Sequence, residues 1–314
     1  MRRRLEVAPE PNRGMSARAA RSAGKTAFVL SGGGSLGAIQ VGMLTALMEA
    51  DVRPDFMIGT SVGAVNAAWL AARPDVPGAQ KLAEIWCGLR RQDIFPLNAW
   101  AGALGLFGRT NHVIPNAGLR SVLEKNLPYD RLEEAAVPVH VITTDLKSGR
   151  AVVISSGPAV PALLASTAIP GVFPPVTIGH RDLVDGGVAH HTPIAAAIEL
   201  GATRVFVLPI GYPWARTQPN HALGMALQAL ARFVEQRLEA EARAYGESAQ
   251  ILMLPTVDEI SVSPADFSRT QDLIKLAYRS SRRYLAAATA PPRAVQPAAA
   301  LKLREMSGMA APAA

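Results

Sequence analysis

The sequence has one cysteine among its 314 residues and few charged side chains. The single thiol, Cys87, excludes a disulfide within the chain, and so few cysteines fit a reducing compartment. We expect Cys87 to be buried in a helix, and nothing around it indicates a nucleophilic thiol. Charged residues make up 18% of the chain and hydrophobic residues 49%. This balance is typical of a folded globular protein and argues against a disordered one.

A hydrophobic run is missing behind the basic N-terminal residues, which argues against a secretory signal. The net charge of +7 is concentrated at this end, where seven Lys or Arg residues face only two Glu within positions 1–25. We predict that residues 1–24 form a disordered basic tail. The tail could contact anionic lipid or nucleic acid, or stay solvated, and Met15 could be the true start.

Charged residues are also absent from residues 26–48, a stretch about as long as a helix that spans a bilayer. Three adjacent glycines, Gly32 to Gly34, interrupt it, and each costs about 1 kcal/mol relative to alanine inside a helix. A buried strand, a glycine loop and a buried helix explain the stretch better. We therefore predict a soluble, cytoplasmic protein, with peripheral contact at the inner membrane surface as an open option.

Short apolar runs alternate with helical patterns along most of the chain. Strands are predicted at residues 27–30, 55–58, 137–144, 151–154, 204–210 and 250–254. Helices are predicted at residues 38–50, 64–72, 78–90, 116–126, 158–168, 193–200, 221–245 and 266–288. This order predicts an α/β fold, with a mostly parallel central sheet and helices on both faces.

No internal repeat or linker divides the core, so we assign residues 25–288 to one domain. The Ala/Pro-rich residues 289–314 are predicted to be a loose tail. Within the domain, the stretch around Trp100 to Phe107 is apolar and glycine-rich without a clear period. It could be a mobile flap that admits apolar substrate, or a packed loop.

The pentapeptide from Gly59 to Gly63 reads G-x-S-x-G, follows an apolar strand and precedes an Ala-rich helix. This order predicts that Ser61 is exposed at the tip of a sharp turn. Gly59 and Gly63 would leave the room that such a strained turn needs. The same pattern also occurs in ordinary turns, so it leaves the role of Ser61 open by itself.

Residues 32–37 formally match the dinucleotide-binding pattern G-x-G-x-x-G between a strand and a helix. That function requires an acidic residue at the end of the next strand, whereas Asp51 and Asp55 precede this strand. The alternative is an anion cradle, because glycines let successive backbone N–H groups converge. Opposite a serine nucleophile, such a cradle would stabilise the oxyanion of a tetrahedral intermediate.

A third glycine-rich signal, from Asp185 to Gly187, ends a strand-like run. Asp-Gly is common in plain turns, but at the carboxyl edge of the sheet Asp185 would face Ser61. A serine nucleophile requires a base, and a histidine is the usual one. The candidate histidines are His112, His140, His180, His190, His191 and His221. A histidine-assisted triad therefore stays open, with the adjacent pair after Asp185 as the main candidates.

Together these motifs resemble the patatin-like phospholipase family over residues 26–210. The segment 31–37 resembles its oxyanion loop, Gly59 to Gly63 its nucleophile elbow, and residues 165–175 the block between elbow and aspartate. Asp185, Gly186 and Gly187 match its D-G-[GA] motif. The resemblance implies a patatin-like three-layer α/β sandwich and a hydrolase of lipid acyl esters that needs neither a metal nor a cofactor.

The resemblance also assigns roles to residues. It implies a dyad without histidine, with Ser61 as nucleophile and Asp185 as base. The backbone amides of Gly33 and Gly34, with their neighbours Gly32 and Ser35, would form the oxyanion hole. An aspartate is a weak base at neutral pH, so we expect partial desolvation to raise the pKa of Asp185.

One position departs from the family pattern: Leu36 stands where the family often has Arg or Lys, which leaves the head-group preference open. Our hypothesis is an acyl-ester hydrolase acting on phospholipids or lysophospholipids, with no nucleic acid partner. Two alternatives stay open, a nucleotide-dependent oxidoreductase and a lipid-binding protein without catalytic activity.

Overall fold

A sheet of nine strands organises the chain, in a computed structural model that describes residues 6–7, 24–95, 112–211, 236, 238–257 and 262–289. The main path of the sheet runs in the order β1-β5-β4-β3-β2-β8-β9, and β6 and β7 extend it beside β4. The strands are β1 (Glu6–Val7), β2 (Lys25–Leu30), β3 (Phe56–Thr60), β4 (Val139–Asp145), β5 (Ala151–Ile154), β6 (Val176–Ile178), β7 (Arg181–Asp185), β8 (Ala202–Leu208) and β9 (Gln250–Met253).

The centre of the sheet is parallel, from β4 through β3, β2 and β8 to β9. The antiparallel pairs are β4 with β5, β4 with β7, and β6 with β7. All five residues of β3 are buried, as expected for a parallel strand covered on both faces. The structure thus confirms the predicted α/β fold with a mostly parallel sheet.

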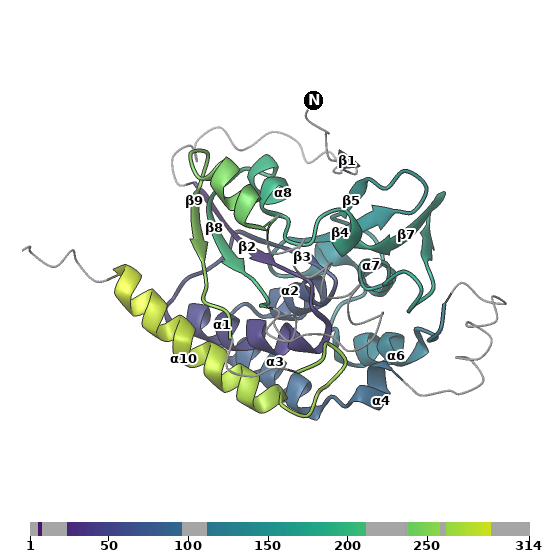
Figure 1. Cartoon of the computed structure of the whole chain (residues 1–314), viewed down its shortest axis with the longest axis horizontal. Coiled ribbons are helices and arrows are strands. Elements are labelled where there is room, and N and C mark those ends of the chain that lie inside the picture. The colour runs from purple at the N-terminus through teal and green to yellow at the C-terminus, as the bar shows by residue number, and fades with distance from the viewer. Residues whose placement is uncertain are drawn as a thin grey trace, which may run out of the picture.

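Helices cover both faces of the sheet (Figure 1). They are α1 (Gly37–Glu49), α2 (Val62–Ala72), α3 (Val76–Gly88), α4 (Arg91–Ile94), α6 (Ala117–Asn126), α7 (Ala159–Ser166), α8 (Ile194–Glu199) and α10 (Thr270–Thr289). The larger core lies under α1, α2, α3 and α10, and α8 and the helical residues 238–245 cover the other face. Successive side chains of β2 point to opposite faces of the sheet, so Phe28 packs in the larger core and Val29 in the core on the other face.

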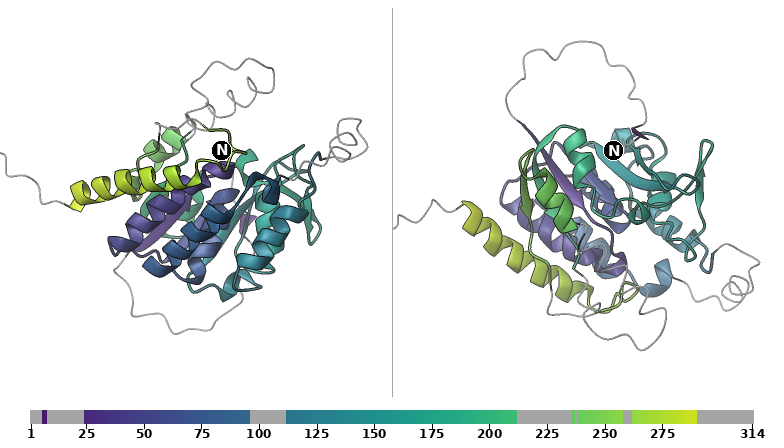
Figure 2. Two further views of the ribbon diagram at one scale, coloured as in Figure 1. Left: turned by 90° about the horizontal axis from the view of Figure 1, so that it is seen from below. Right: turned by 45° about the horizontal axis from the view of Figure 1, so that its top comes forward.

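The charge-free stretch 26–48 forms β2, a glycine loop and α1, as predicted. Helix α1 is apolar nearly all round because it lies between the sheet and α10, which runs alongside it (Figure 2). Gly42 permits this contact, because a Cβ there would meet the backbone of Ile274 and Tyr278. Among the helices described, none is long and apolar enough to cross a membrane.

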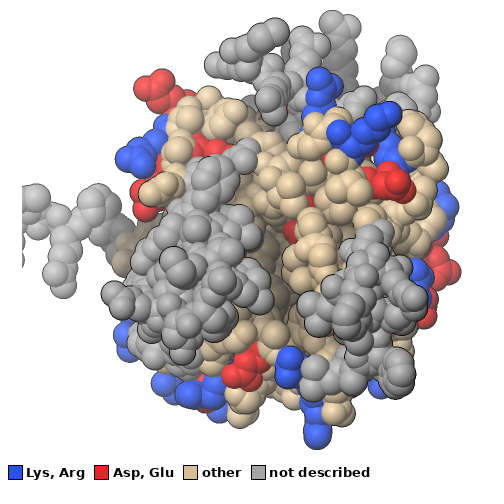
Figure 3. All heavy atoms as spheres, turned by 45° about the vertical axis from the view of Figure 1, so that its right-hand side comes forward, with Lys and Arg blue, Asp and Glu red and all other residues tan. Residues whose placement is uncertain are grey.

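Charges of both signs are interspersed on the face shown in Figure 3, around a centre that is largely uncharged. The described residues therefore form no single basic patch on this face. Most of the predicted basic tail, the stretch 98–108 and most of the predicted helix 221–245 lie outside the described residues, as does nearly all of 289–314. Within the tail, Glu6 and Val7 pair with β5 in parallel.

The prediction that Cys87 is buried was wrong, because its side chain is exposed. Cys87 does lie in a helix, α3, whose buried face carries Ala79, Leu82 and Trp86. These residues recur at intervals of three and four, so the residue directly after Trp86 points to another face of the helix.

Candidate active site

Ser61 lies on a sharp turn between β3 and α2. Its backbone has φ 56° and ψ −129°, a strained conformation for a residue with a side chain. A Cβ at Gly59 would lie 2.5 Å from the backbone nitrogen of Ala64, and one at Gly63 2.5 Å from the carbonyl oxygens of Leu30 and Ser31. The two glycines therefore let the turn fold tightly, as the G-x-S-x-G pattern predicts. The expectation that Ser61 is exposed was wrong, because only 8% of its surface is accessible at the tip of this turn.

Ser166, the last residue of α7, anchors the elbow. Its hydroxyl accepts a hydrogen bond from the backbone N–H of Ser61 at 2.8 Å and donates one to the carbonyl of Ile142 at 2.6 Å. Ser166 is completely buried, so loss of either bond would leave a buried polar group unpaired. The block 165–175, recognised only as a sequence similarity, thus ties the elbow to β4.

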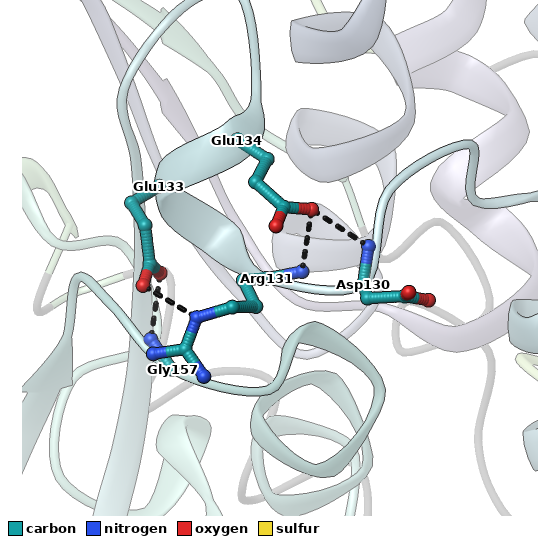
Figure 4. Close-up of polar contacts among 5 residues, drawn as sticks. All are labelled: Asp130, Arg131, Glu133, Glu134 and Gly157. Carbon is teal, nitrogen blue, oxygen red and sulfur yellow. Dashed lines mark hydrogen bonds and ion pairs between the residues drawn. The ribbon is translucent and has the colours of Figure 1, made fainter.

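The loop that leads into α7 is held by a group of polar contacts (Figure 4). The Glu134 carboxylate accepts hydrogen bonds from the N–H groups of Asp130 and Arg131 at 3.1 and 3.2 Å. The Glu133 carboxylate accepts one from Gly157 at 2.8 Å and pairs with the Arg131 guanidinium at 2.8 Å. These groups are exposed, so each contributes little energy. Of these contacts, the bond from Gly157 connects the loop before α7 to the turn at residues 130–134, and the others hold that turn itself.

The sheet register explains why Asp185 reaches Ser61. Strand β5 pairs with residues 141–144 of β4, so β3 and β7, which overlap this range, must both lie on the other side of β4. On that side, β3 ends at Thr60 opposite Ile142, and β7 ends at Asp185 opposite Thr143. The carboxyl ends of β3 and β7 therefore meet, which brings Ser61 and Asp185 together.

Asp185 is buried, with 6% of its surface exposed. Its Oδ1 accepts a hydrogen bond from the backbone N–H of Gly187 at 2.7 Å, and the side chain of Ser61 lies near enough to the carboxylate to lower its pKa. Burial outweighs both effects and raises the pKa of Asp185 to about 6. The carboxylate is therefore a stronger base than a free aspartate, as expected from the sequence.

The glycine loop uses two of its four amides for its own structure. The N–H of Gly32 donates to the carbonyl of His191 at 3.4 Å, and the N–H of Ser35 donates to the carbonyl of Pro264 at 2.7 Å. Within the described part of the chain, the N–H groups of Gly33 and Gly34 make no hydrogen bond. The amides that remain available as anion donors are therefore those of Gly33 and Gly34.

Residues 263 and 264 clamp this loop from outside the region covered by the sequence motifs. Besides the bond to Pro264, the hydroxyl of Ser35 donates to the carbonyl of Ser263 at 3.1 Å. Gly34, at φ 61°, packs directly on the Pro264 carbonyl, where a Cβ would not fit. Sequence reasoning missed this contact, because no local pattern links two segments separated by 228 residues.

A chain of buried side-chain amides holds the residue that precedes the same loop, Ser31. The Gln40 amide donates to the carbonyls of Ser31 at 2.9 Å and Leu208 at 3.0 Å. The Asn66 amide donates to Gln40 at 2.9 Å and accepts from the indole N–H of Trp86 at 2.8 Å. Sequence reasoning missed this chain too. The available signal was two polar residues, Gln40 and Asn66, in helices that are otherwise almost entirely apolar.

An apolar pocket opens beside Ser61 and the Gly34 amide. Its wall includes Trp69 of α2, Leu119 of α6 and two aromatic stacks. The stacks are Trp86 on Phe267, with ring centroids 6.1 Å apart, and Phe95 on Phe173, at 5.6 Å. Leu36, in place of the family's frequent cation, is completely buried in the core, so this position does not face a ligand here.

The histidines occupy different places. The ring of His191 lies between Gly32 and Gly187, beside the serine and the aspartate. His140 is in β4 and hydrogen-bonds to Ser155, and His190 pairs with Glu241 at 3.5 Å. The backbone of His112 forms an isolated β-bridge with Gly171. His180 is exposed beside β7, and His221 lies outside the described residues.

The sequence model of the patatin-like phospholipase family matches residues 28–198, more than half of the chain. This range contains the glycine loop, the elbow and Asp185 in the arrangement described above. The chain belongs to the patatin-like phospholipase family.

Two curated relatives contain a region similar to this chain. Patatin-like phospholipase domain-containing protein 7 of Mus musculus is 30% identical over 189 residues, covering 59% of this chain and 13% of the relative. Lysophospholipase NTE1 of Coccidioides immitis is 25% identical over 291 residues, covering 85% of this chain and 18% of the relative. This patatin-like chain thus spans less than a fifth of the length of either relative.

Solved structures also resemble the patatin-like chain. VipD from Legionella pneumophila aligns with 84% of it and 67% of VipD, at 15% identity and a TM-score of 0.44. Human GIVD cytosolic phospholipase A2, in complex with methyl gamma-linolenyl fluorophosphonate, aligns with 84% of this chain and 59% of its own, at 15% identity and a TM-score of 0.42.

Proposed function

We propose that this chain is a serine acyl hydrolase that releases fatty acid from phospholipids or lysophospholipids. One observation carries the proposal: Ser61, on a strained elbow, meets the buried carboxylate of Asp185, whose pKa burial raises to about 6. Ser61 lines an apolar pocket together with Gly34, whose N–H, like that of Gly33, makes no hydrogen bond within the described residues. A nucleophile, a base and anion donors are therefore all present at one place.

In the first step, the Ser61 oxygen attacks the ester carbonyl while its proton passes to Asp185. A pKa near 6 keeps Asp185 largely ionised at neutral pH yet basic enough to accept this proton. The proton then goes from Asp185 to the leaving alcohol as the ester bond breaks. The products of this step are the acyl-Ser61 ester and the free alcohol, and Asp185 is again ionised.

In the second step, Asp185 takes a proton from water, and the hydroxide equivalent attacks the acyl-Ser61 carbonyl. Collapse of the intermediate releases the fatty acid and returns the proton to Ser61. The N–H groups of Gly33 and Gly34 would donate to the oxyanion in both steps, and the following helix α1 adds its positive end. No step requires a metal or a cofactor.

The pocket supports a lipid acyl group as the substrate. Its aromatic and aliphatic wall offers an acyl chain contacts that water does not compete for. The names of the lysophospholipase relatives are in keeping with this choice. The buried Leu36 supplies no cation for a phosphate, so we place recognition in the acyl chain and not in the head group.

The proposal is tested with the purified chain on p-nitrophenyl octanoate and on lysophosphatidylcholine, with and without prior treatment by an alkyl fluorophosphonate. We expect release of p-nitrophenol and of fatty acid by the untreated protein, and loss of both after treatment. Added EDTA should change neither rate. An untreated protein that hydrolyses neither substrate would contradict the proposal and favour a lipid-binding role.

Replacement of Gly34 by alanine is expected to lower kcat for p-nitrophenyl octanoate by about 10²–10³-fold, the usual effect of losing one oxyanion donor. The new Cβ would meet the Pro264 carbonyl at a residue with φ 61°, so the amide must move. The matched control is Gly149→Ala. Gly149 has φ 66° but open space around it, so this variant should keep its activity. Equal rates for both variants would contradict the role of the Gly34 amide.

Replacement of Leu119 by tryptophan is expected to shorten the acyl chain that the pocket accepts. The larger ring would fill the part of the pocket that α6 contributes. We expect kcat/KM for p-nitrophenyl decanoate to fall by about tenfold, equal to the loss of about 1.4 kcal/mol of apolar contact, and kcat/KM for the acetate to stay unchanged. The control is Glu124→Trp on an exposed face of the same helix. Parallel losses on both esters would argue that the acyl chain lies elsewhere.

A further inference from the structure

The ring of His191 connects the two halves of the site. It contacts Gly32 at the start of the glycine loop, where a Cβ would lie 2.9 Å from Cε1 of the ring. It also contacts Gly187, where a Cβ would lie 3.2 Å from Nδ1. The N–H of Gly187 holds the Asp185 carboxylate, so the ring packs between the oxyanion loop and the turn that carries the base.

His191 contacts the backbone of Gly32 through both its ring and its own carbonyl. The ring donates a hydrogen bond to the backbone of Gly32, and the carbonyl of His191 accepts the N–H of Gly32 at 3.4 Å. The position of Gly32 is also tied to the nucleophile, because a Cβ there would lie 3.2 Å from Cβ of Ser61. A change at residue 191 would therefore alter the positions of the glycine loop, Asp185 and Ser61.

The ring is poorly placed to act as the base itself. The Asp185 carboxylate lies near the Ser61 side chain, and the ring interacts with the backbone of Gly32. Burial also lowers the pKa of His191 to about 4, so the imidazole is neutral at neutral pH. A ring with a pKa of about 4 is a weak base at neutral pH, but it can still donate to a backbone carbonyl and hold a loop.

We propose that His191 is a positioning residue that fixes the oxyanion loop relative to Asp185 by packing between Gly32 and Gly187 and binding the Gly32 peptide. The inference rests on the proposed hydrolase function of the same site. It replaces the histidine-assisted triad with a role in geometry. The requirement is a planar donor at residue 191, not a group that gains and loses a proton.

The experiment compares kcat and KM of wild type, His191→Asn and His191→Ala for p-nitrophenyl butyrate between pH 5 and 9. An Asn side chain can still donate to Gly32, so we expect its kcat within about fivefold of wild type. For His191→Ala we expect kcat to fall by about 10²-fold at nearly unchanged KM, since the oxyanion donors lose their placement. The acid limb, set by Asp185, should stay near pH 6 in all three.

The surface variant His180→Ala provides the matched control, because His180 is exposed beside β7, and it should match wild type. If His191→Ala fails to fold, His191→Gln takes its place. Its longer amide reaches past Gly32, so we expect kcat to fall, but by less than the 10²-fold expected for His191→Ala. Loss of activity in His191→Asn as severe as in His191→Ala, or a shifted acid limb, would make His191 a proton carrier and overturn the proposal. Full activity in His191→Ala would also overturn it.

These results separate the two proposals. An active wild type with unexpected His191 variants contradicts the positioning role alone, whereas an inactive wild type contradicts the hydrolase function and the positioning role with it.

Discussion

Replacing Ser61 by alanine is expected to lower kcat for p-nitrophenyl octanoate by about 10⁴–10⁶-fold, to a level set by the remaining binding and oxyanion donors. The reason is that no other serine is placed against a buried carboxylate among the described residues. The fold should survive, because the backbone N–H of residue 61 still donates to Ser166. Initial rates and thermal unfolding of the purified variant measure both effects.

The matched control is Ser121→Ala, an exposed serine on α6 that should keep wild-type activity. A Ser61→Ala protein with the melting temperature of wild type and more than a hundredth of its kcat would exclude Ser61 as the nucleophile.

Replacing Asp185 by asparagine is expected to lower kcat by about 10³–10⁴-fold and, at the same time, to stabilise the fold above pH 6. Asparagine keeps an acceptor for the Gly187 N–H but cannot take the proton of Ser61. A nucleophile without its base then depends on water, which explains the loss. A substitution that removes activity and gains stability is the mark of a residue kept for chemistry.

The sign of the stability effect follows from the raised pKa. The pKa of Asp185 rises from 3.8 in the free residue to about 6 in the fold, so folding favours the protonated form. This stabilisation is fully present below pH 3.8 and is lost as the pH rises through 6. Above pH 6 the buried carboxylate costs about 3 kcal/mol, which asparagine avoids. The stability gain of Asp185→Asn should therefore appear at pH 8 and vanish near pH 4.

Urea unfolding at pH 4 and pH 8 measures this difference. The control is Asp145→Asn at the β4–β5 turn, whose carboxylate accepts the backbone N–H of Ser148 at 2.7 Å. Hydrogen bonds from Ser148 lower the pKa of Asp145 below 3.8, so its carboxylate stays ionised at both pH values and asparagine there should destabilise the fold at pH 4 as well as at pH 8. A loss of stability in Asp185→Asn at pH 8 would contradict the buried, high-pKa base.

The sequence predicts the local geometry of the site because that geometry depends on neighbours in the chain. Gly59 indicates the elbow at Ser61, since a side chain there would strike the backbone of Gly63 and Ala64 in the same turn. Gly63 belongs to the same pattern, although the space it leaves is taken by the backbone of Leu30 and Ser31. The alternation of apolar runs and helical patterns likewise predicts the parallel sheet, and with it the edge at which Ser61 lies.

The sequence motifs and the family resemblance predict that Asp185 faces Ser61, but they do not predict the strand pairing and backbone contacts that complete the site, because these join segments far apart in the chain. The meeting of Ser61 with Asp185 depends on β7 pairing antiparallel with β4 on the side where β3 ends. The division of the loop amides depends on the carbonyls of His191 and Pro264, which take the N–H groups of Gly32 and Ser35. Every residue has a backbone carbonyl, so the residue type does not indicate which carbonyl accepts these hydrogen bonds. The pattern therefore indicated four donors where the structure leaves those of Gly33 and Gly34.

The most direct test of the Ser61–Asp185 dyad is to locate the adduct of an alkyl fluorophosphonate by peptide mass spectrometry and to follow its rate of formation against pH. The dyad predicts a single adduct, on the peptide that contains Ser61, with a rate that falls as the pH drops below about 6. It also predicts that Asp185→Asn forms this adduct far more slowly at every pH. An adduct on another residue, or one that forms on Ser61 at the same rate with and without Asp185, would contradict the account.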